Sequence, residues 1–404
     1  MEKADFYKNA RLDRNGPIDG ISVLDVTTTW AGPMAGCVLA DLGADVIKVE
    51  HPNGDVGRRL LPKLPGRDLG IPAETVHRNK RCITLDLAKP KGRDLFLQLA
   101  ADVDVVIENF KPGTMTRWGV GYEEVSAAKP NIVYVSISGF GQFGPLSHLP
   151  GYDPVAQNFS GWTSLNGAPD GGPTKAPTFL GDDLAGLHGA IGALAALRHR
   201  DATGEGQQVD VALVDSMIFQ CNGQLTAGAS GIEAQRWGNQ FNLATPVNLY
   251  PTLDDIVFIG VLLDSHWVEM CSMIGSESLS KLGLMERLER RAEINAVLGQ
   301  WCAQQHTTAD ILRACAERGL PATAVNTFAQ AADHEHVRAR DMLQEVPLSD
   351  GQIAPLTGPA AKFSRTPTQI RSPAPVIGQN NTDILQGLGY SAEQIAELAA
   401  HGVI

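Results

Sequence analysis

Apolar positions near the N-terminus of the chain alternate between the period of a strand and that of a helix. An apolar run at 21–27 is followed by a turn, by a segment with an apolar stripe, and by a second predicted strand at 45–50. The same order of strand, helix and strand returns over 82–110, and a further apolar run at 131–138 ends in the turn GFGQFGP. Repeated β-α-β alternation predicts an α/β fold whose mostly parallel sheet is covered on both faces.

A long helix is predicted over 179–200, where FLGDDLAGLHGAIGALAALRHR combines an apolar character with three glycines. Gly186, Gly189 and Gly192 recur every three residues and leave one narrow face of the helix without side chains. Each glycine inside a helix costs about 1 kcal/mol relative to alanine. We therefore expect a neighbouring helix or a ligand to approach this face closely.

A further helix is predicted from about 214 to 227, and the pattern changes after residue 226. A hairpin is predicted over 249–262, and three helical segments follow between about 266 and 317. A strand-like piece and one more helix complete a second, smaller α+β domain at 226–344. In the remaining tail, Ser391 and Gln394 form a capping box that predicts a final helix.

The composition narrows the possible function classes. The chain of 404 residues has a formal net charge of −12 and no dense Lys/Arg cluster, which argues against a nucleic-acid or anionic-membrane surface. The N-terminal region is charged and the apolar runs are far shorter than a membrane span, so we expect a soluble cytoplasmic protein. Six cysteines without a C-x-x-C pair fit a reducing compartment, and ten histidines without a ligand spacing predict no metal site.

Two familiar catalytic patterns are absent from the sequence. The turn WAGPMAG opens a helix and Glu50 ends the next strand, but G-x-G-x-x-G is missing and Pro33 offers no N–H to a pyrophosphate. A plain βαβ turn with proline at the first helical position explains this segment better. The nucleophile-elbow pattern G-x-S-x-G does not occur either. A nicotinamide enzyme and a serine hydrolase are therefore disfavoured.

Two adjacent aspartates head the glycine-rich helix. Asp182 or Asp183 fits a helix cap, with the other favoured in the first turn by the helix dipole. A carboxylate at a helix start, beside a glycine-lined face, can also act as a nucleophile toward an acyl group. The residues by themselves leave both interpretations open.

Several long motifs occur in a fixed order. They are GPIDGISVLDVTTTWAGPMAGCVLADLGADVIKVEHPNGD, NKRCITLDL, VIENFKPGTMTRWGVGYEEV, SISGFGQFGP, GYDPVAQNFSG, GDDLAGLHGAIGALAALRHRDATGEGQQVDVAL and, in the tail, APVIGQNNTDILQGLGYSAEQI. With these motifs nearly the whole chain resembles the class III CoA-transferases, which include formyl-CoA transferase, carnitine CoA-transferase and α-methylacyl-CoA racemase. The segments VAQNFSGWTSLNG and GYSAEQI bring it closest to the carnitine CoA-transferase branch.

The resemblance implies an unusual architecture. Members of the family form interlocked homodimers in which each chain is an open ring threaded by the other. Residues 1–225 and the C-terminal segment 345–404 would then build one large Rossmann-like, CoA-binding domain, with 226–344 as the small domain. The partner would be a second copy of the chain or a homologous subunit.

The resemblance also implies the site residues. Asp182 matches the family's nucleophile, four residues before Gly186, and Asp183 is left with a capping or solvent role. Coenzyme A, as a substrate, would contact Trp30, Ala31, His51, Leu85, Ala88, Asn109, Phe110, Lys111, Arg117 and Tyr152. Within this set, Lys111 and Arg117 would face phosphates, Leu85 and Ala88 adenine, and Trp30 and Ala31 the pantetheine end.

Departures from the family's patterns favour one reaction over others. The racemase branch has a histidine as its second acid–base group in the motif that reads GYDPVAQ here, whereas this chain has Tyr152. Transfer of CoA is therefore favoured over racemisation, with a CoA-ester isomerase or a non-catalytic CoA-binding subunit as alternatives. Formate and oxalate are not expected as substrates. The segment that corresponds to the glycine-rich loop of formyl-CoA transferase reads GNQFNLATPVNLYPT here and has one glycine. Trp30 also stands where formyl-CoA transferase has a small polar residue. Succinyl-CoA is a plausible donor.

Overall fold

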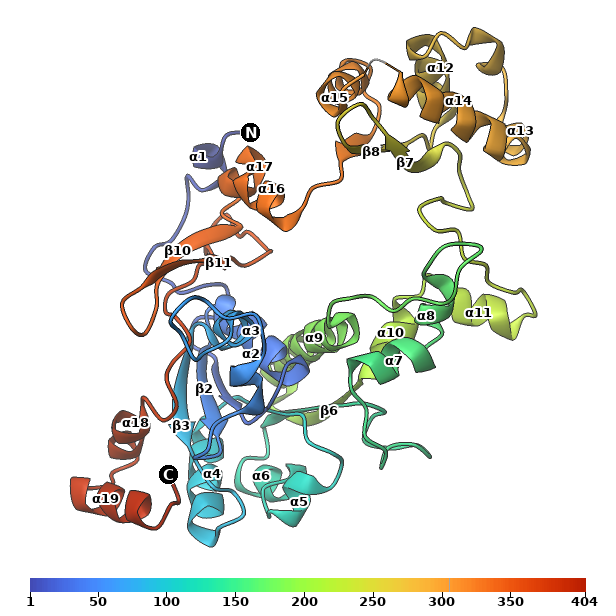
Figure 1. Cartoon of the computed structure of the whole chain (residues 1–404). Coiled ribbons are helices and arrows are strands. Elements are labelled where there is room, and N and C mark those ends of the chain that lie inside the picture. The colour runs from blue at the N-terminus through green and yellow to red at the C-terminus, as the bar shows by residue number, and fades with distance from the viewer. Residues whose placement is uncertain (305) are drawn as a thin grey trace. The chain divides into compact units, whose positions relative to one another are not determined.

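A six-stranded parallel sheet forms the centre of the larger part of the chain (Figure 1), in a computed structural model that describes residues 1–304 and 306–404. The strand order is β3-β2-β1-β4-β5-β6, and every neighbouring pair is parallel. Its strands are β1 (Ser22–Asp25), β2 (Asp45–Glu50), β3 (Lys80–Thr84), β4 (Val105–Glu108), β5 (Val133–Ser138) and β6 (Gln207–Ala212). The predicted parallel α/β sheet is confirmed.

Alternate side chains of the strands enter two separate cores, one on each face of the sheet. On β1, Val23 joins one core and Leu24 the other, and both are fully buried. The Val23 core is covered by α2 (Ala31–Asp41), α9 (Leu180–Thr203) and α10 (Leu213–Phe219). The Leu24 core is covered by α4 (Pro90–Asp102), α6 (Tyr122–Ala128), α18 (Asn381–Gly387) and α19 (Ala392–Ala400). The helices α18 and α19, from the end of the chain, thus complete a core begun by its first strand.

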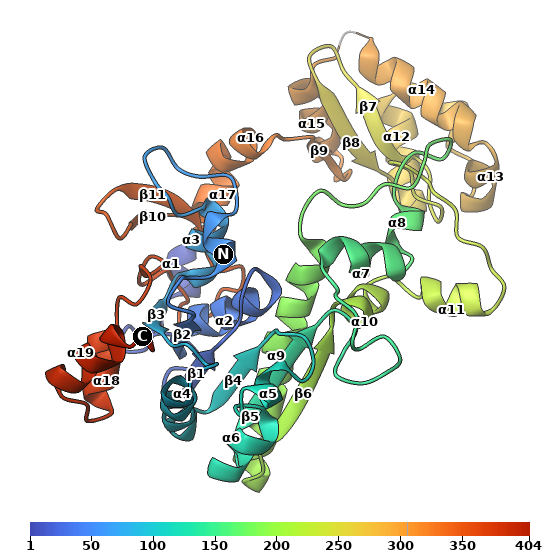
Figure 2. The ribbon, with the colours of Figure 1, turned by 60° about the horizontal axis from the view of Figure 1, so that its bottom comes forward.

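The glycine face of α9 is packed against the chain's own elements, and α9 runs alongside β5 and β6 (Figure 2). A Cβ on Gly186 would lie 2.8 Å from the carbonyl oxygen of Ala31 in α2. A Cβ on Gly189 would lie 2.7 Å from the Cδ1 of Ile137. The expected close approach is therefore made by a neighbouring helix and by the sheet beneath it.

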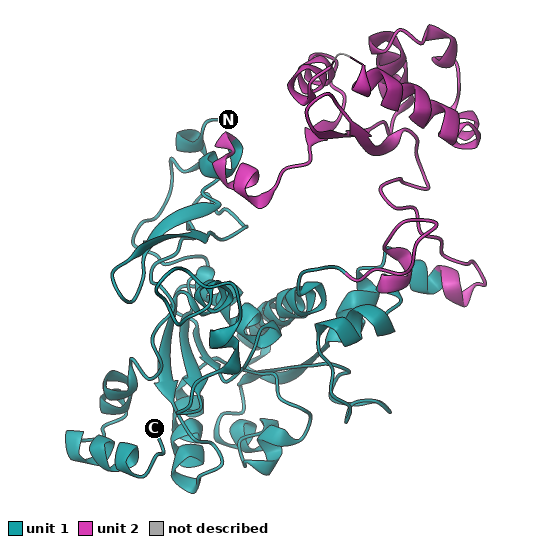
Figure 3. Ribbon diagram, viewed as in Figure 1, with its two compact units in different colours: residues 1–162, 176–226, 336–404 teal, residues 163–175, 227–335 magenta. Residues whose placement is uncertain are grey.

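The chain divides into two compact units, coloured separately in Figure 3. Unit 1 comprises 1–162, 176–226 and 336–404, and unit 2 comprises 163–175 and 227–335. The C-terminal residues therefore pack with the N-terminal part. In unit 1 the tail also forms an antiparallel hairpin, β10 (Leu343–Pro347) with β11 (Ile353–Thr357), that the sequence did not predict.

Unit 2 contains a three-stranded antiparallel sheet. Its strands are β7 (Val247–Pro251), β8 (Ile256–Gly260) and β9 (Ala322–Ala324). Its core includes the fully buried Trp267. Four α-helices lie where three were predicted: α12 (Asp264–Met273), α13 (Leu284–Glu289), α14 (Arg291–Ala303) and α15 (Thr308–Glu317). The predicted hairpin is confirmed as β7 and β8.

One predicted helix of unit 1 is broken. The segment expected to run from 214 to 227 forms α10 and a separate α11 (Gln224–Ala229). Between them Asn222 and Gly223 adopt left-handed backbone conformations, with φ of 50° and 79°, which a continuous helix does not allow. Within the described residues, no helix is long and apolar enough to cross a membrane.

The remaining helices are short. They are α1 (Lys3–Phe6), α3 (Ile71–His77), α5 (Thr114–Arg117), α7 (Asp153–Phe159), α8 (Trp162–Leu165), α16 (Phe328–Asp333) and α17 (Glu335–Ala339), with 3-10 turns at Val56–Arg59 and Glu277–Leu279. The predicted capping box on the final helix is confirmed: the Ser391 hydroxyl accepts from the backbone N–H of Gln394, and the Gln394 side chain accepts from the Ser391 N–H. Of these helices, α5 and α7 border the site described next.

Candidate active site

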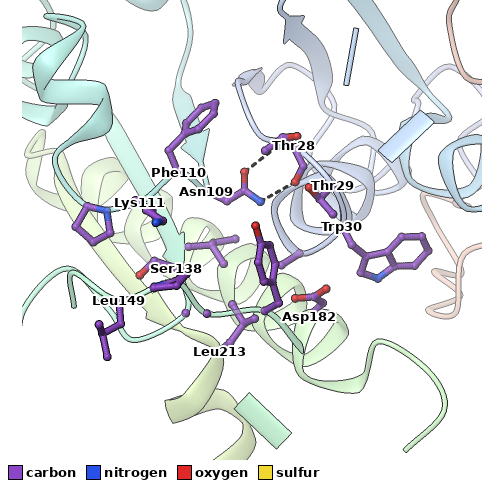
Figure 4. A pocket seen from close by; sticks show the side chains of 17 residues that line it. Thr28, Thr29, Trp30, Asn109, Phe110, Lys111, Ser138, Leu149, Asp182 and Leu213 are labelled. Atoms are coloured by element: carbon purple, nitrogen blue, oxygen red, sulfur yellow. Dashed lines mark hydrogen bonds between the residues drawn. The ribbon is translucent and has the colours of Figure 1, made fainter. Parts of the chain in front are cut away.

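A pocket of about 230 Å³ opens at the carboxyl ends of the central strands (Figure 4). The strand order reverses direction between β1 and β4, so the loops that follow these two strands diverge and leave a crevice. This first pocket is lined by Thr28, Thr29, Trp30, Ala31, Asn109, Phe110, Lys111, Pro112, Ile137, Ser138, Gly139, Leu149, Pro150, Gly151, Tyr152, Asp182 and Leu213. All of them belong to unit 1.

The loop after β1 is held rigidly at the pocket wall. The side-chain amide of Asn109 accepts from the backbone N–H of Thr28 at 2.8 Å and donates to its carbonyl at 2.8 Å, as the dashed lines in Figure 4 show. Asp55 accepts from the Thr28 hydroxyl at 2.7 Å and from the Thr29 N–H at 3.0 Å. Thr29 has a φ of 69°, a conformation that non-glycine residues rarely adopt. Asn109 and Asp55 therefore fix this loop.

The two adjacent aspartates at the start of α9 have different surroundings. Asp183 accepts a hydrogen bond of 2.6 Å from the indole Nε1 of Trp30. Asp182 is half-buried and lines the first pocket, on the same side as Trp30 in Figure 4. No side chain caps α9 at its N-cap residue, Phe179. The capping role expected for Asp183 is therefore wrong: this half-buried carboxylate binds the tryptophan instead.

The carboxyl group of Asp182 lies in a place that disfavours its charge. Burial, followed by the negative charges of Asp153 and Asp183, raises its pKa from 3.8 to about 7. Within the described part of the chain, no basic group counteracts this rise. A strongly shifted titratable group in a pocket is a candidate for catalysis.

A second pocket of about 280 Å³ adjoins the first and shares Thr28 and Phe110 with it. It lies after the ends of β2 and β3, and its apolar walls include Leu85, Ala88 and Trp118. The ring of Trp118 meets that of Phe110 edge to face, at 5.0 Å between centroids. Together the two pockets follow the carboxyl edge of the sheet.

Most of the predicted site residues line one of these pockets. Trp30, Ala31, Asn109, Phe110, Lys111, Tyr152 and Asp182 line the first, and His51, Leu85, Ala88 and Phe110 line the second. Arg117 lines neither; its exposed guanidinium donates to the hydroxyl of Thr114 at 2.9 Å.

Sequence reasoning missed Trp118 and Asp55. Trp118 directly follows the predicted Arg117, and its aromatic side chain was a signal for an apolar wall. Asp55 contributes to the site by binding Thr28 and Thr29 in the loop after β1, and the spacing of these residues in the sequence does not reveal such contacts. No cluster of three or more His, Cys, Asp or Glu side chains suited to a metal ion occurs in residues 1–304 and 306–404.

Comparisons with known proteins agree on one family. The family described as CoA-transferase family III matches residues 18–381. The succinyl-CoA–L-malate CoA-transferase beta subunit of Chloroflexus aurantiacus is 35% identical over 401 residues, covering 96% of this chain and 98% of the relative. The succinyl-CoA:mesaconate CoA-transferase of Haloarcula marismortui is 34% identical over 388 residues, covering 93% of this chain and 97% of the relative.

A solved structure supports the same assignment. The crystal structure of a CaiB/BaiF family protein from Brucella suis matches with a TM-score of 0.83 at 33% identity, and the match covers 93% of this chain and 100% of that one. The predicted resemblance is thus confirmed by the family match, by the curated relatives and by the fold. The chain belongs to CoA-transferase family III, and its activity is the transfer of CoA between a CoA thioester and a carboxylate.

Proposed function

We propose that Asp182 is the nucleophile of this transfer. One carboxylate oxygen of Asp182 attacks the thioester carbonyl of the donor, the C–S bond breaks, and CoA leaves as a thiolate from a mixed aspartyl anhydride. The thiolate then attacks the aspartyl carbonyl, which releases the donor acid as a carboxylate and leaves an aspartyl-CoA thioester. The acceptor carboxylate repeats both steps in reverse, so no proton or water is consumed. The observation that carries this proposal is the Asp182 carboxyl, lining the pocket where the loops of β1 and β4 diverge.

The donor CoA thioester is proposed to lie along both pockets. Its adenine would occupy the second pocket, against Leu85, Ala88 and the ring of Trp118. The pantetheine arm would pass Phe110, which lines both pockets, and reach Trp30 beside Asp182. The exposed ammonium group of Lys111 would pair with a phosphate, as a point charge at the pocket mouth. Arg117 and His51 would add charge or hydrogen bonds near the nucleotide.

The proposed substrates follow from the relatives. The Chloroflexus and Haloarcula proteins are named for succinyl-CoA as donor and for the dicarboxylic acids malate and mesaconate as acceptors. We therefore propose succinyl-CoA as the donor and a small dicarboxylic acid as the acceptor for this chain. The proposed reaction takes place in the cytoplasm.

Two-substrate kinetics test the nucleophile. Succinyl-CoA is varied against L-malate and then against mesaconate, and the CoA ester of the acceptor is measured by chromatography. A covalent aspartyl intermediate predicts parallel lines in double-reciprocal plots. The D182N variant should lose at least about a thousandfold in kcat, whereas D183N, which keeps an oxygen for the Trp30 indole, should retain most of it. Intersecting lines, or an active D182N variant, would refute the assignment of Asp182.

Racemisation, the alternative that the resemblance implies, is disfavoured by the residues of the first pocket. Tyr152 lines the first pocket with its side chain largely exposed, and none of the described residues that line this pocket is a histidine. Racemisation needs an acid–base pair on opposite sides of the α-carbon. Incubation of the protein with 2-methylacyl-CoA in deuterium oxide distinguishes a CoA-transferase from a racemase, since only a racemase or isomerase introduces deuterium at the α-carbon.

The quaternary structure is also part of the proposal. Large apolar side chains are exposed on two neighbouring helices: Leu187 (45% exposed) and Ile191 (60%) on α9, and Phe219 (75%) on α10. Exposed apolar groups that cluster on a surface often mark a subunit interface. We propose that an interlocked second copy covers them. The Chloroflexus relative is named as a beta subunit, so a homologous partner is the alternative, and light scattering of the purified chain decides whether it dimerises alone.

A further inference from the structure

Two buried polar side chains on α7 are bound to the segment that leads into α9. Asp153 and Gln157 are 3% and 0% exposed, and neither lines the first pocket. The Gln157 amide oxygen accepts from the backbone N–H of Ala176 at 2.8 Å, and its Nε2 donates to Asp153 at 2.8 Å. A buried polar pair of this kind is costly unless it is fully bonded, so its bonds fix where the backbone runs.

Asp153 contacts the first turn of α9 directly. Its Oδ1 accepts from the backbone N–H of Gly181 at 2.7 Å, one residue before Asp182. A Cβ on Gly181 would lie 3.2 Å from that same oxygen, so the absence of a side chain allows α7 to approach this closely. On the other flank, Trp30 donates to Asp183 at 2.6 Å. Both neighbours of Asp182 are therefore tied to other elements, one to α7 and one to the start of α2.

We propose that Asp153 is a positioning residue for the CoA transfer: with Gln157 behind it, it holds the Gly181 backbone so that the Asp182 carboxyl lines the pocket at a fixed place. The inference rests on the proposed role of Asp182 as the nucleophile. A nucleophile works best when the reacting atoms are held about 3–3.5 Å apart, and a displacement of about 1 Å can cost a hundredfold in rate. Asp153 itself touches neither substrate nor reacting atoms.

The charge of Asp153 gives its role a signature that a purely structural contact lacks. The charged groups that act on the Asp182 carboxyl are Asp153 from α7 and Asp183 from α9. The pocket that Asp182 lines also contains Lys111 and Tyr152 from its loops, Trp30 from the start of α2 and Leu213 from α10. Of the two carboxylates, Asp153 contributes more to raising the pKa of Asp182. Removal of its charge should therefore move the acid limb of the pH–rate profile to lower pH.

Three variants separate the effect of Asp153 on the position of Asp182 from the effect of its charge. D153A removes both the Gly181 contact and the charge, and we expect kcat to fall about tenfold to a hundredfold while the KM for succinyl-CoA changes less than about twofold. D153N keeps a carbonyl oxygen for the Gly181 N–H but loses the acceptor for the Gln157 amide, so its kcat on the alkaline plateau should match that of Q157L and exceed that of D153A, with the acid limb shifted downward. Q157L removes the hydrogen bonds from Gln157 to Asp153 and Ala176 but changes no charge. Its kcat should therefore fall while the acid limb of the pH–rate profile stays in place.

Matched controls keep the test interpretable. D201N removes one negative charge near the far end of the same helix and should change neither kcat nor the acid limb. The inference is overturned if D153N loses as much kcat as D153A, if its acid limb stays in place, or if D153A keeps the wild-type kcat. Should D153A not fold, D153N and Q157L still decide the matter. An active D182N would instead overturn the proposed function.

Discussion

Replacing Asp182 with asparagine should make the protein more stable while abolishing transfer. The pKa of this carboxyl lies at about 7 instead of 3.8, chiefly because of burial. At about 1.36 kcal/mol per pKa unit, this displacement corresponds to about 4 kcal/mol of unfavourable ionisation in the folded state. The amide of asparagine also loses water on burial, so we expect a net gain of about 2 kcal/mol at pH 8.

The pH dependence of this gain follows from the direction of the shift. Between about pH 4 and pH 7 the folded chain keeps a proton on Asp182 that the unfolded chain releases, so the stability of the wild type falls as the pH rises through this window. The difference in stability between D182N and the wild type should therefore change by about 4 kcal/mol across this window, from about 2 kcal/mol in favour of the wild type near pH 4 to about 2 kcal/mol in favour of D182N above about pH 7.

Thermal unfolding between pH 4.5 and pH 8.5 measures this difference. A gain of about 2 kcal/mol should raise the apparent Tm of D182N by about 2 °C at pH 8. D183N is the matched control and should gain less, because Asp183 already receives a hydrogen bond from Trp30 that favours its charged form. The reasoning is refuted if D182N is less stable than the wild type at pH 8, or if the difference between them does not change with pH.

Three further predictions concern the walls of the site. K111A should weaken CoA binding about tenfold in calorimetric titration, with a smaller salt dependence than the wild type and little change in kcat; an unchanged affinity would exclude the phosphate contact. W30F keeps a ring but loses the bond to Asp183, and its kcat should fall about fivefold to tenfold with an unchanged Tm; a wild-type kcat would contradict this role. G186A places a methyl group 2.8 Å from α2 and should lower stability by about 1–3 kcal/mol in denaturant unfolding, whereas G228A, which meets open space, should not.

The sheet could be predicted because its strands are buried on both faces. The strand at 133–138, for example, is buried along its whole length, and β2 begins and ends at the predicted residues. The hairpin of β10 and β11 escaped prediction because its strands bury few residues and contain Pro347 and Pro355, which lower strand propensity. The break after α10 was missed because Asn222 and Gly223 are bracketed by helix-compatible residues.

The site was predictable only as far as family motifs reach. The motifs predicted Asp182 and a set of CoA contacts, and in the structure Asp182 and most of these contacts line two adjoining pockets. The bonds that fix Asp182 join residues far apart in the chain: Trp30 and Asp183 are separated by 153 positions, and Asp153 and Gly181 by 28. Such pairs arise from the packing of α2, α7 and α9, which no local pattern encodes.

Chemical trapping of the intermediate tests the central claim most directly. The protein is incubated with succinyl-CoA and hydroxylamine, digested, and mapped by mass spectrometry. Hydroxylamine converts an activated aspartyl anhydride or thioester into a hydroxamate on that side chain. A hydroxamate on Asp182 that requires the acyl-CoA, with Asp183 and Asp153 unmodified, is the predicted result. An unmodified Asp182 while CoA is demonstrably bound and transferred would contradict covalent catalysis by this residue.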